Sequence, residues 1–450
     1  MTKKILMVLT IGVLIRLFLA FSTFHSDVQP FYFAGEVIAK GNVLNFYDYL
    51  RNLPTHDPIL KIYPANLFNY PPLVYFFLGP ISYLVSLPFS RDLLHGFIFN
   101  LPALLGNIQL NFLLLILKFP YLPFDLGIAA LLYKFFKDPK NKFLAFTLWM
   151  FNPINLYATY MMGQFDVIPT FLAVLALFVA VKKEKYFLAA LFLGLGASFK
   201  IFPFLFLVPL ALMKSKWLDR IKILGIGTLT YLATILPFIN SHGFRATALL
   251  AGQTTKSLYA TLPISGGEAI IFFPFFILFT YIIFFFIKGT ADNLWQRFFM
   301  VILLFFVFTH THPQWFLWLT PFLVIDLIKS RFSHWPLTIT LFVVWLGQVT
   351  FFDPGLSVWL FSPISPGLYG LPGIWTNLGI NLDINFARSI LQTVFVSVAA
   401  YFIYNSIQED LAARCEDELN ADMSSSLKGK PRTLVRGGYH NYFPKKVDKK

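Results

Sequence analysis

The chain of 450 residues is 57% hydrophobic and 19% aromatic, whereas only 13% of its residues are charged. That charged fraction is about half of what a soluble domain carries, and a protein of this size has too little interior to bury so much apolar surface. These values exclude a disordered chain, a disulfide-rich secreted scaffold and a soluble multidomain enzyme, and they predict a polytopic membrane protein. The single cysteine, Cys415, excludes an internal disulfide and a thiolate metal cluster.

The formal net charge of +14 is interpreted as a signal of membrane orientation rather than of nucleic-acid binding. Lys and Arg are retained on the cytoplasmic side of a membrane protein, so basic clusters mark inner loops. Lys3 and Lys4 precede a long apolar run that lacks a small-residue cleavage site. This pattern predicts an uncleaved first helix over residues 5–24 with a cytoplasmic N-terminus, and a signal peptide is the alternative.

Apolar runs and basic clusters then alternate along the chain and predict roughly 12 spans of the length that a bilayer requires. Residues 25–69 are too polar to span, and the proline-interrupted run 71–87 either spans or lies along the interface. One alternation places the later basic clusters on the inner side: 134–142, 182–185, 214–222, 288–297 and 329–331. We expect outer loops near 240–267 and 353–385, and a cytoplasmic C-terminus.

The sequence therefore predicts two regions, a transmembrane domain over 1–408 and a charged cytoplasmic tail over 409–450. Residues 408–422 are acidic and amphipathic, whereas 428–450 are strongly basic. The simplest interpretation of this tail is a disordered, positive-inside segment. The alternative is attraction to anionic lipid headgroups.

The same alternation places the unusual polar residues at helix ends on the outer side. Ionisable groups at this depth are unfavourable, so each is a functional candidate. They are Asp27, Asp57, Gln164, Asp166, Lys200, His310, His312, Gln314 and Asp353. A transporter would concentrate such groups near the bilayer midplane. The arrangement instead favours a site that is open to the outer leaflet and acts on a molecule with a polar head.

Each of these residues also has a purely structural interpretation. Asp27 follows the first helix at the water boundary, where a carboxylate is well tolerated. Lys200 either extends harmlessly to the interface or pairs with a lipid-linked phosphate. Gln164 and Asp166 are also suited to capping a helix end.

His310 and His312 stand two positions apart, so they would not share one face of a helix. No carboxylate lies between them, which makes a metal site a weak hypothesis. The segment from His312 to Gln314 is equally suited to binding a phosphate or a sugar hydroxyl. The sequence contains no phosphate-binding glycine loop, zinc-protease motif or nucleophile elbow.

Five short motifs occur in a fixed order between residue 26 and about residue 328. They are Ser26-Asp27-Val28-Gln29-Pro30, Asn69-Tyr70-Pro71-Pro72-Leu73, the stretch 152–166 that ends in Gly-Gln-Phe-Asp, the Gly-rich stretch 194–203 that ends in Lys-Ile-Phe-Pro, and the His-Pro-Gln-Trp-Phe-Leu-Trp stretch 312–318. This ordered set resembles the GT-C superfamily of integral-membrane glycosyltransferases. Within it, the chain is most similar to polyprenol-phosphate-mannose-dependent mannosyltransferases, including the family of the first GPI mannosyltransferase.

The resemblance implies a GT-C-type helical bundle whose long first outer loop contains juxtamembrane helices. It also implies transfer of a hexose, expected to be mannose, from a polyprenyl-phosphate-linked donor to an acceptor hydroxyl, with inversion. Asp27 would be the general base. Lys200, assisted by His310 or His312, would bind the donor phosphate. Gln164, Asp166 and Gln314 would position sugars, and Gln29 and Asp57 are further candidates for that role.

One departure from the family pattern concerns the first outer loop. Many relatives have Asp-x-Asp there, whereas this chain has Gln29 in the second acidic position. Asp57 is the candidate for a second carboxylate, or for a further group that positions the substrate. We therefore expect no essential metal and no cofactor. The implied partners are the lipid-linked donor, membrane lipids and an acceptor that is a glycolipid, a glycan or a protein, but no nucleic acid.

Two other functions remain open at this stage. A transporter or flippase would need internal inverted repeats and a carboxylate in the middle of a helix, and we recognise neither in the sequence. Arg16, inside the first helix, is explained by a position facing the bundle. A non-catalytic subunit of a glycosylation complex is the second alternative, and the presence of Asp27 argues against it.

Overall fold

The computed structural model describes residues 2–249, 255–287, 289–309 and 312–426, with the backbone alone for 413–426. The regular secondary structure of the described chain is almost all helix, which confirms the predicted all-α class. Five of its helices are long and apolar enough to cross a membrane: Thr2–Ser22, Ile108–Phe135, Trp217–Phe238, Ala291–Phe308 and Ile384–Ala412. Shorter apolar helices accompany them, namely Pro72–Ser86, Tyr186–Ala197, Phe202–Leu212, Phe272–Phe286 and Trp335–Phe351.

The regular elements are as follows. The α-helices are α1 (Thr2–Ser22), α2 (Val28–Ala39), α3 (Pro72–Ser86), α4 (Arg91–Phe99), α5 (Ile108–Lys118), α6 (Leu122–Phe135), α7 (Pro139–Met150), α8 (Pro153–Asn155), α9 (Val167–Lys183), α10 (Tyr186–Ala197), α11 (Leu207–Leu212), α12 (Trp217–Ile235), α13 (His242–Phe244), α15 (Phe272–Phe286), α16 (Leu294–Phe308), α17 (Thr320–Lys329), α18 (Trp335–Phe351), α19 (Ile374–Asn377) and α20 (Ile384–Ser426). A short antiparallel hairpin joins β1 (Thr261–Pro263) to β2 (Ala269–Ile271). The described residues also include the π-helices Leu156–Met161 and Arg245–Leu249.

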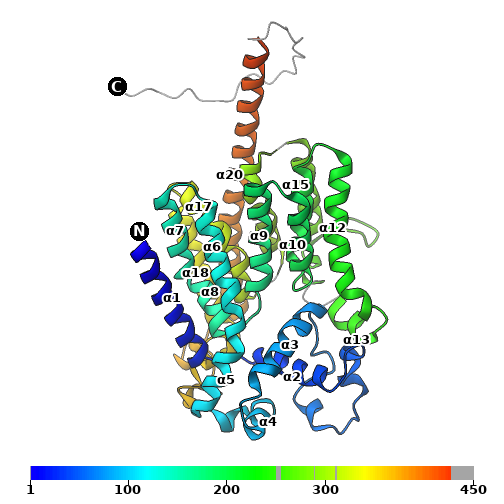
Figure 1. Ribbon diagram of the computed structural model, residues 1–450, viewed down its shortest axis with the longest axis vertical. Helices are drawn as coiled ribbons and strands as arrows, with labels where there is room; N and C mark the ends of the chain where they lie inside the picture. The colour runs from blue at the N-terminus through cyan, green and yellow to red at the C-terminus, as the bar shows by residue number, and fades with distance from the viewer. Residues whose placement is uncertain (1, 250–254, 288, 310–311, 427–450) are drawn as a thin grey trace.

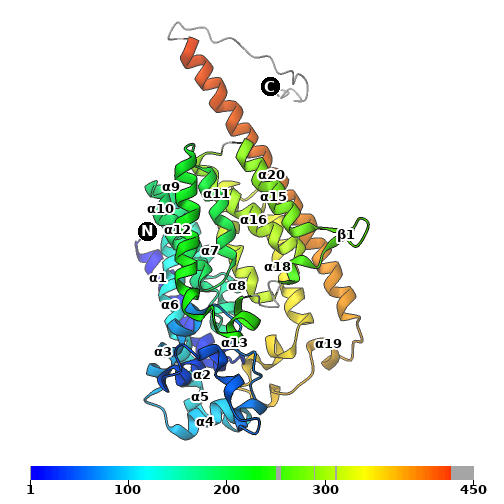
Figure 2. The same cartoon turned by 90° about the vertical axis from the view of Figure 1, so that its right-hand side faces the viewer.

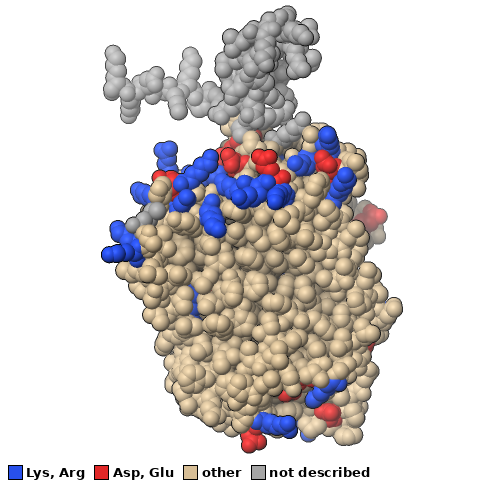
Figure 3. Space-filling model, viewed as in Figure 1, with Lys and Arg blue, Asp and Glu red and all other residues tan. Residues whose placement is uncertain are grey.

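The long helices form one bundle, and α2, α3 and α4 gather at one end of it (Figures 1 and 2). The last helix, α20, leaves the bundle at the opposite end. Lys and Arg side chains crowd the end from which α20 leaves, and the surface below them is largely uncharged (Figure 3). This gathering is what a single positive-inside alternation predicts, whereas the assignment of that end to the cytoplasm stays a prediction.

Helices α2 and α3 pack against each other through two glycines. A Cβ atom on Gly35 would collide with the carbonyl oxygen of Gly79, so the two backbones are in direct contact. Around this contact, the rings of Phe46, Phe68 and Tyr75 pack with centroids 4.2 to 5.2 Å apart. Helices α2 and α3, called the α2–α3 layer below, are therefore closely packed. Their packing sets the positions of the short segments that precede each of the two helices.

We expect Gly35→Ala to lower the free energy of unfolding by about 1–3 kcal/mol, because an overpacked contact forces the two helices apart. Thermal unfolding of the detergent-purified protein measures this change. Gly225→Ala in α12 is the matched control, since an added Cβ there meets nothing within 4 Å and alanine favours the helix. Equal stability of the two variants would contradict the close packing of α2 on α3.

A buried ion pair joins α1 to α6, which corrects our expectation that no carboxylate lies within a span. Arg16 Nε donates to Asp125 Oδ2 at 2.5 Å, and both side chains are fully buried. The same carboxylate accepts hydrogen bonds from Trp149 Nε1, Asn155 Nδ2 and Tyr160 Oη at 2.7 to 2.8 Å. The sequence could not indicate this pair because its members are 109 positions apart. Its hydrogen bonding suits a structural link between helices.

A second buried pair places the start of the predicted tail in the bundle. Arg297, which we expected in an inner turn, lies fully buried in α16 and donates to Asp410 Oδ2 at 3.1 Å. Asp410 belongs to α20, which continues without a break through the predicted boundary at residue 408. The basic segment 427–450 lies outside the described residues.

Candidate functional site

A cavity of about 670 Å³ lies where the α2–α3 layer meets the bundle. Its walls combine the segments before α2 and α3 with the loop after α10 and the segments that follow α16 and α18. The polar residues in these walls are His25, Ser26, Asp27, Asn69, Tyr70, Lys200, Tyr231, Ser257, His312, Gln314 and Asp353. Five residues that the sequence indicated as candidates thus face one space: Asp27, Lys200, His312, Gln314 and Asp353.

Asp27 stands immediately before α2, at the edge of the cavity. Its side chain is 41% exposed, and Oδ2 accepts a hydrogen bond from Nε2 of the fully buried Gln164. His25 Nδ1 lies 3.6 Å from the same oxygen. The carboxylate is therefore oriented by a buried amide on one side and remains open to the cavity on the other.

Lys200 lies in the loop that follows α10 and pairs with a buried carboxylate. Its Nζ donates to Asp166 Oδ1 at 2.7 Å, and Trp318 Nε1 donates to the same oxygen at 2.6 Å. Asp166 is fully buried, and Lys200 is 8% exposed. Burial lowers the pKa of the Lys200 ammonium below its ordinary value, and the Asp166 carboxylate opposes that shift. Gln164 is thus hydrogen-bonded to Asp27, and Asp166 is hydrogen-bonded to Lys200.

Four aromatic rings surround the Lys200 ammonium. Its Nζ lies 5.0 Å from the ring centre of Trp318, 5.3 Å from those of Phe165 and Trp315, and 5.6 Å from that of Tyr70. Each distance is within the range of a cation–π interaction. The rings hold the ammonium at the cavity wall and limit its contact with water, which strengthens its attraction for an anionic group entering the cavity.

His312 and Gln314 line the same cavity, next to Trp315. The His312 ring packs 5.2 Å from Trp315 and 5.4 Å from Phe352. Gln314 is 6% exposed, and within the described chain its Oε1 has no hydrogen-bond partner. A buried acceptor of this kind suits a hydroxyl donor from a ligand. His310 falls outside the described residues.

The structure does not bring Gln29 and Asp57 to this cavity. Gln29 Nε2 donates instead to the backbone oxygen of Phe97, so the glutamine in the Asp-x-Gln pattern supports the packing of α2 on α4. Asp57 Oδ1 accepts from the backbone N–H of Ile59 at 3.0 Å and caps a short 3₁₀ turn. A local turn decides the direction of Asp57, whereas the packing of α4 beside α2 decides that of Gln29. The sequence spacing revealed neither. Across the described ranges, no group of three or more His, Cys, Asp or Glu side chains is arranged to hold a metal ion.

A buried lysine that sequence reasoning missed fixes the two segments that carry the site. Lys118 Nζ donates to the backbone oxygens of Thr23 at 2.6 Å and Tyr160 at 2.9 Å. Thr23 follows α1, four positions before Asp27, and Tyr160 lies in the π-helix four positions before Gln164. The apolar neighbours of Lys118 in the sequence were its only signal. This lysine sets the relative placement of Asp27 and Gln164.

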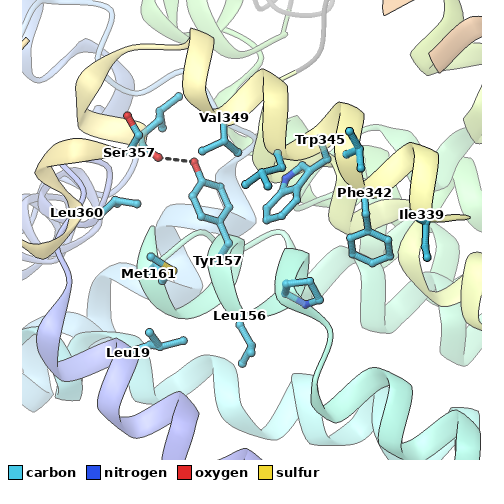
Figure 4. Close-up of a pocket in the computed structure, with 14 residues that line it drawn as sticks. Leu19, Leu156, Tyr157, Met161, Ile339, Phe342, Trp345, Val349, Ser357 and Leu360 are labelled. Atoms are coloured by element: carbon cyan, nitrogen blue, oxygen red, sulfur yellow. Dashed lines mark hydrogen bonds between the residues drawn. The ribbon is translucent and has the colours of Figure 1, made fainter. Parts of the chain in front are cut away.

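A second, apolar cavity of about 610 Å³ lies among α1, the π-helix Leu156–Met161 and α18 (Figure 4). Tyr157 Oη donates to the backbone oxygen of Leu356 at 2.8 Å, which ties the π-helix to the segment after α18. Val343 and Leu346 border this cavity and are 60% and 56% exposed, so it opens to the surroundings of the bundle. Leu356 is part of the walls of both cavities.

The fold and these cavities define a class of protein, an all-α membrane-type bundle with a charged cavity next to an apolar one. Residues 68–247 of the chain match the profile of glycosyltransferase family 87. The match includes Tyr70, Gln164, Asp166 and Lys200 and does not extend to Asp27. It supports a membrane glycosyltransferase. A search among curated proteins finds no match to the chain.

Proposed function

We propose that the chain transfers a hexose, expected to be mannose, from a polyprenyl-phosphate-linked donor to an acceptor hydroxyl at the outer face of the membrane. The observation that carries this proposal is that Asp27 and Lys200 line the same cavity, so a carboxylate and a buried cation face one space. The family 87 match supports the reaction class. The charge distribution in Figure 3 supports cytoplasmic termini and a site on the opposite side.

The proposed reaction is a single displacement at C1 of the donor sugar. Asp27 accepts the proton of the acceptor hydroxyl, whose oxygen forms the new bond to C1. The bond from C1 to the phosphate oxygen breaks, and the polyprenyl phosphate leaves with the electron pair, inverting the anomeric centre. Lys200, with His312 on the same wall, stabilises the negative charge that develops on the departing phosphate. Gln314 contributes an acceptor for a sugar hydroxyl.

The apolar cavity suits the lipid chain of the donor. Leu356 borders both cavities, so the two are neighbours, and a donor with its phosphate near Lys200 would extend its chain past Leu356 toward α18. The described lining of the apolar cavity carries no charged side chain, and Tyr157 and Ser357 supply its hydroxyl groups. A prenyl chain would gain about 0.8 kcal/mol for each CH₂ that it buries there.

The experiment that tests the function uses the purified full-length chain in lipid nanodiscs. Polyprenyl-phosphate-[¹⁴C]mannose is supplied with octyl α-mannoside as acceptor, and GDP-[¹⁴C]mannose replaces the donor in a parallel reaction. We expect labelled disaccharide from the lipid-linked donor and none from the nucleotide sugar. Absence of transfer from polyprenyl-phosphate-linked mannose, glucose and arabinose alike would overturn the proposal.

Leu346→Trp tests the assignment of the lipid chain. The larger side chain narrows the apolar cavity, so we expect KM for a long-chain donor to rise about ten-fold, which corresponds to a loss of about 1.4 kcal/mol. A donor with a ten-carbon chain should be unaffected. Leu229→Trp on α12, where the leucine is 66% exposed and borders neither cavity, is the matched control. An unchanged KM for the long-chain donor would contradict this placement.

A further inference from the structure

A third cavity, of about 480 Å³, lies beside the charged cavity, among the ends of α16 and α18 and the first turns of α20. Its volume falls within the range of about 300–1,000 Å³ that ligand pockets occupy. Unlike the apolar cavity, it is lined by many polar side chains: Thr309, Gln348, Asn385, Arg388, Ser389 and Gln392. None of them is used by the reaction proposed above.

Two buried polar atoms in this lining have no protein partner among the described residues. Gln348 Oε1 and Thr309 Oγ1 make no hydrogen bond there, and their residues are 5% and 2% exposed. Buried polar groups in folded proteins are nearly always hydrogen-bonded, so such atoms call for an explanation. A carboxamide oxygen is only an acceptor, which means that its missing partner is a donor such as a hydroxyl.

The remaining lining adds a positive charge and an aromatic face. The Arg388 guanidinium lies over the ring of Phe352 at 4.1 Å from the ring centre. Gln392 Nε2 donates to the backbone oxygen of Phe306 at 2.9 Å, which holds that side chain against α16. Amides, hydroxyls and an aromatic ring are the groups that bind sugar hydroxyls and sugar faces, and a guanidinium binds a phosphate or a carboxylate.

Phe352 is shared by this cavity and the charged one. On the side of the charged cavity, the His312 ring packs 5.4 Å from Phe352. A saccharide that passes this ring would therefore reach from the space at Asp27 to the space at Arg388. The reacting hydroxyl and a more distant sugar of one acceptor then occupy neighbouring cavities.

We propose that the third cavity is an acceptor subsite, which binds a sugar remote from the reacting hydroxyl together with an anionic group on that sugar. Gln348 and Thr309 bind hydroxyls, and Arg388 binds the anion. The inference rests on the proposed function and specifies its acceptor class, an acidic oligosaccharide or glycolipid of at least two sugars. Phosphate and uronate carboxylate offer the same charge chemistry to Arg388.

Binding is measured in the Asp27→Asn protein, so that it does not depend on turnover. The probes are methyl mannotrioside, its terminal 6-phosphate and the matching trisaccharide that ends in a uronic acid, each titrated by calorimetry in nanodiscs. We expect both acidic trisaccharides to bind about ten-fold more tightly than the neutral one, because a charge-assisted hydrogen bond is stronger than a neutral one. The larger of the two gains identifies the natural anion.

Two variants in the same background locate the binding. Arg388→Gln should remove the preference for acidic probes, whereas Arg245→Gln should keep it, since Arg245 is exposed and outside this cavity. Gln348→Leu should weaken all three probes about five-fold, as expected for the loss of one hydrogen bond. That variant replaces a buried amide with an apolar group of similar size and is expected to fold.

Equal affinity for neutral and acidic probes, or an undiminished preference in Arg388→Gln, would overturn the subsite. Inorganic phosphate alone, if it binds as tightly as the phosphotrisaccharide, would overturn the sugar part of the proposal. Transfer from the lipid-linked donor is measured separately, in the protein with Asp27 unchanged, to octyl α-mannoside and to the phosphotrisaccharide. Intact transfer with no acidic preference refutes only the subsite, and acidic preference without transfer refutes only the proposed reaction.

Discussion

Asp27→Asn is expected to lower the rate of sugar transfer by about 10²–10⁴-fold, the contribution typical of a general base. The asparagine has the same shape, and its carboxamide oxygen still accepts the hydrogen bond from Gln164. The side chain is 41% exposed, so no buried charge is left unpaired. Single-turnover transfer of label from the lipid-linked donor measures the effect, and unfolding should occur at the same temperature as in the unchanged protein.

Asp57→Asn is the matched control for this variant. Asp57 caps a 3₁₀ turn away from the cavity, and asparagine is also a good capping residue. Transfer should remain within about two-fold of the unchanged protein, the range expected for a substitution outside the site. Full activity of Asp27→Asn, or an equal loss in both variants, would remove Asp27 from the role of base.

Lys200→Met is expected to reduce both stability and transfer. Removing one member of a buried ion pair leaves Asp166 without its cation, which costs about 3–5 kcal/mol of unfolding free energy. The loss of a cation at the developing phosphate charge should lower the transfer rate by about 10²–10³-fold. Denaturant or thermal unfolding in detergent measures the first effect, and the labelled-donor assay measures the second.

The double variant Lys200→Met with Asp166→Asn separates the two effects. It removes both charges, and Trp318 Nε1 still has an oxygen to which it can donate. Stability should return to within about 1 kcal/mol of the unchanged protein, because neutral replacement of a buried pair is often nearly neutral in free energy. Transfer should stay low. Recovery of transfer in the double variant would show that Lys200 acts only by holding Asp166.

The sequence predicted the helical class and part of the set of residues that gather, because the membrane imposes strong constraints along the chain. Apolar length, proline breaks and basic clusters together limit where a polar residue lies along a span. Asp27, Lys200 and the pair His312 and Gln314, taken from three separate segments, line one cavity for this reason. This inference uses only the position of each polar residue along a span, so it does not require knowledge of how the side chains pack.

What the sequence could not predict is how side chains pair across the bundle. Lys200 and Asp166 are 34 positions apart. Besides Phe165, which is next to Asp166, the rings around the ammonium come from two further segments, those of Tyr70 and of Trp315 and Trp318. Gln29 turns toward Phe97 because α4 packs beside α2. Pairing of this kind depends on the crossing of particular helices, which hydrophobic periodicity does not encode.

The contact between Lys200 and Asp166 has a consequence for product release. In the proposed reaction the donor carries a phosphodiester with one negative charge, whereas the released polyprenyl phosphate is a monoester that approaches two negative charges at neutral pH. A bare lysine would hold this product more tightly than the donor and slow each turnover. Since Asp166 already offsets the charge of Lys200, the Lys200–Asp166 pair is close to neutral, and in the proposed reaction it would hold the spent lipid less tightly than a bare lysine would.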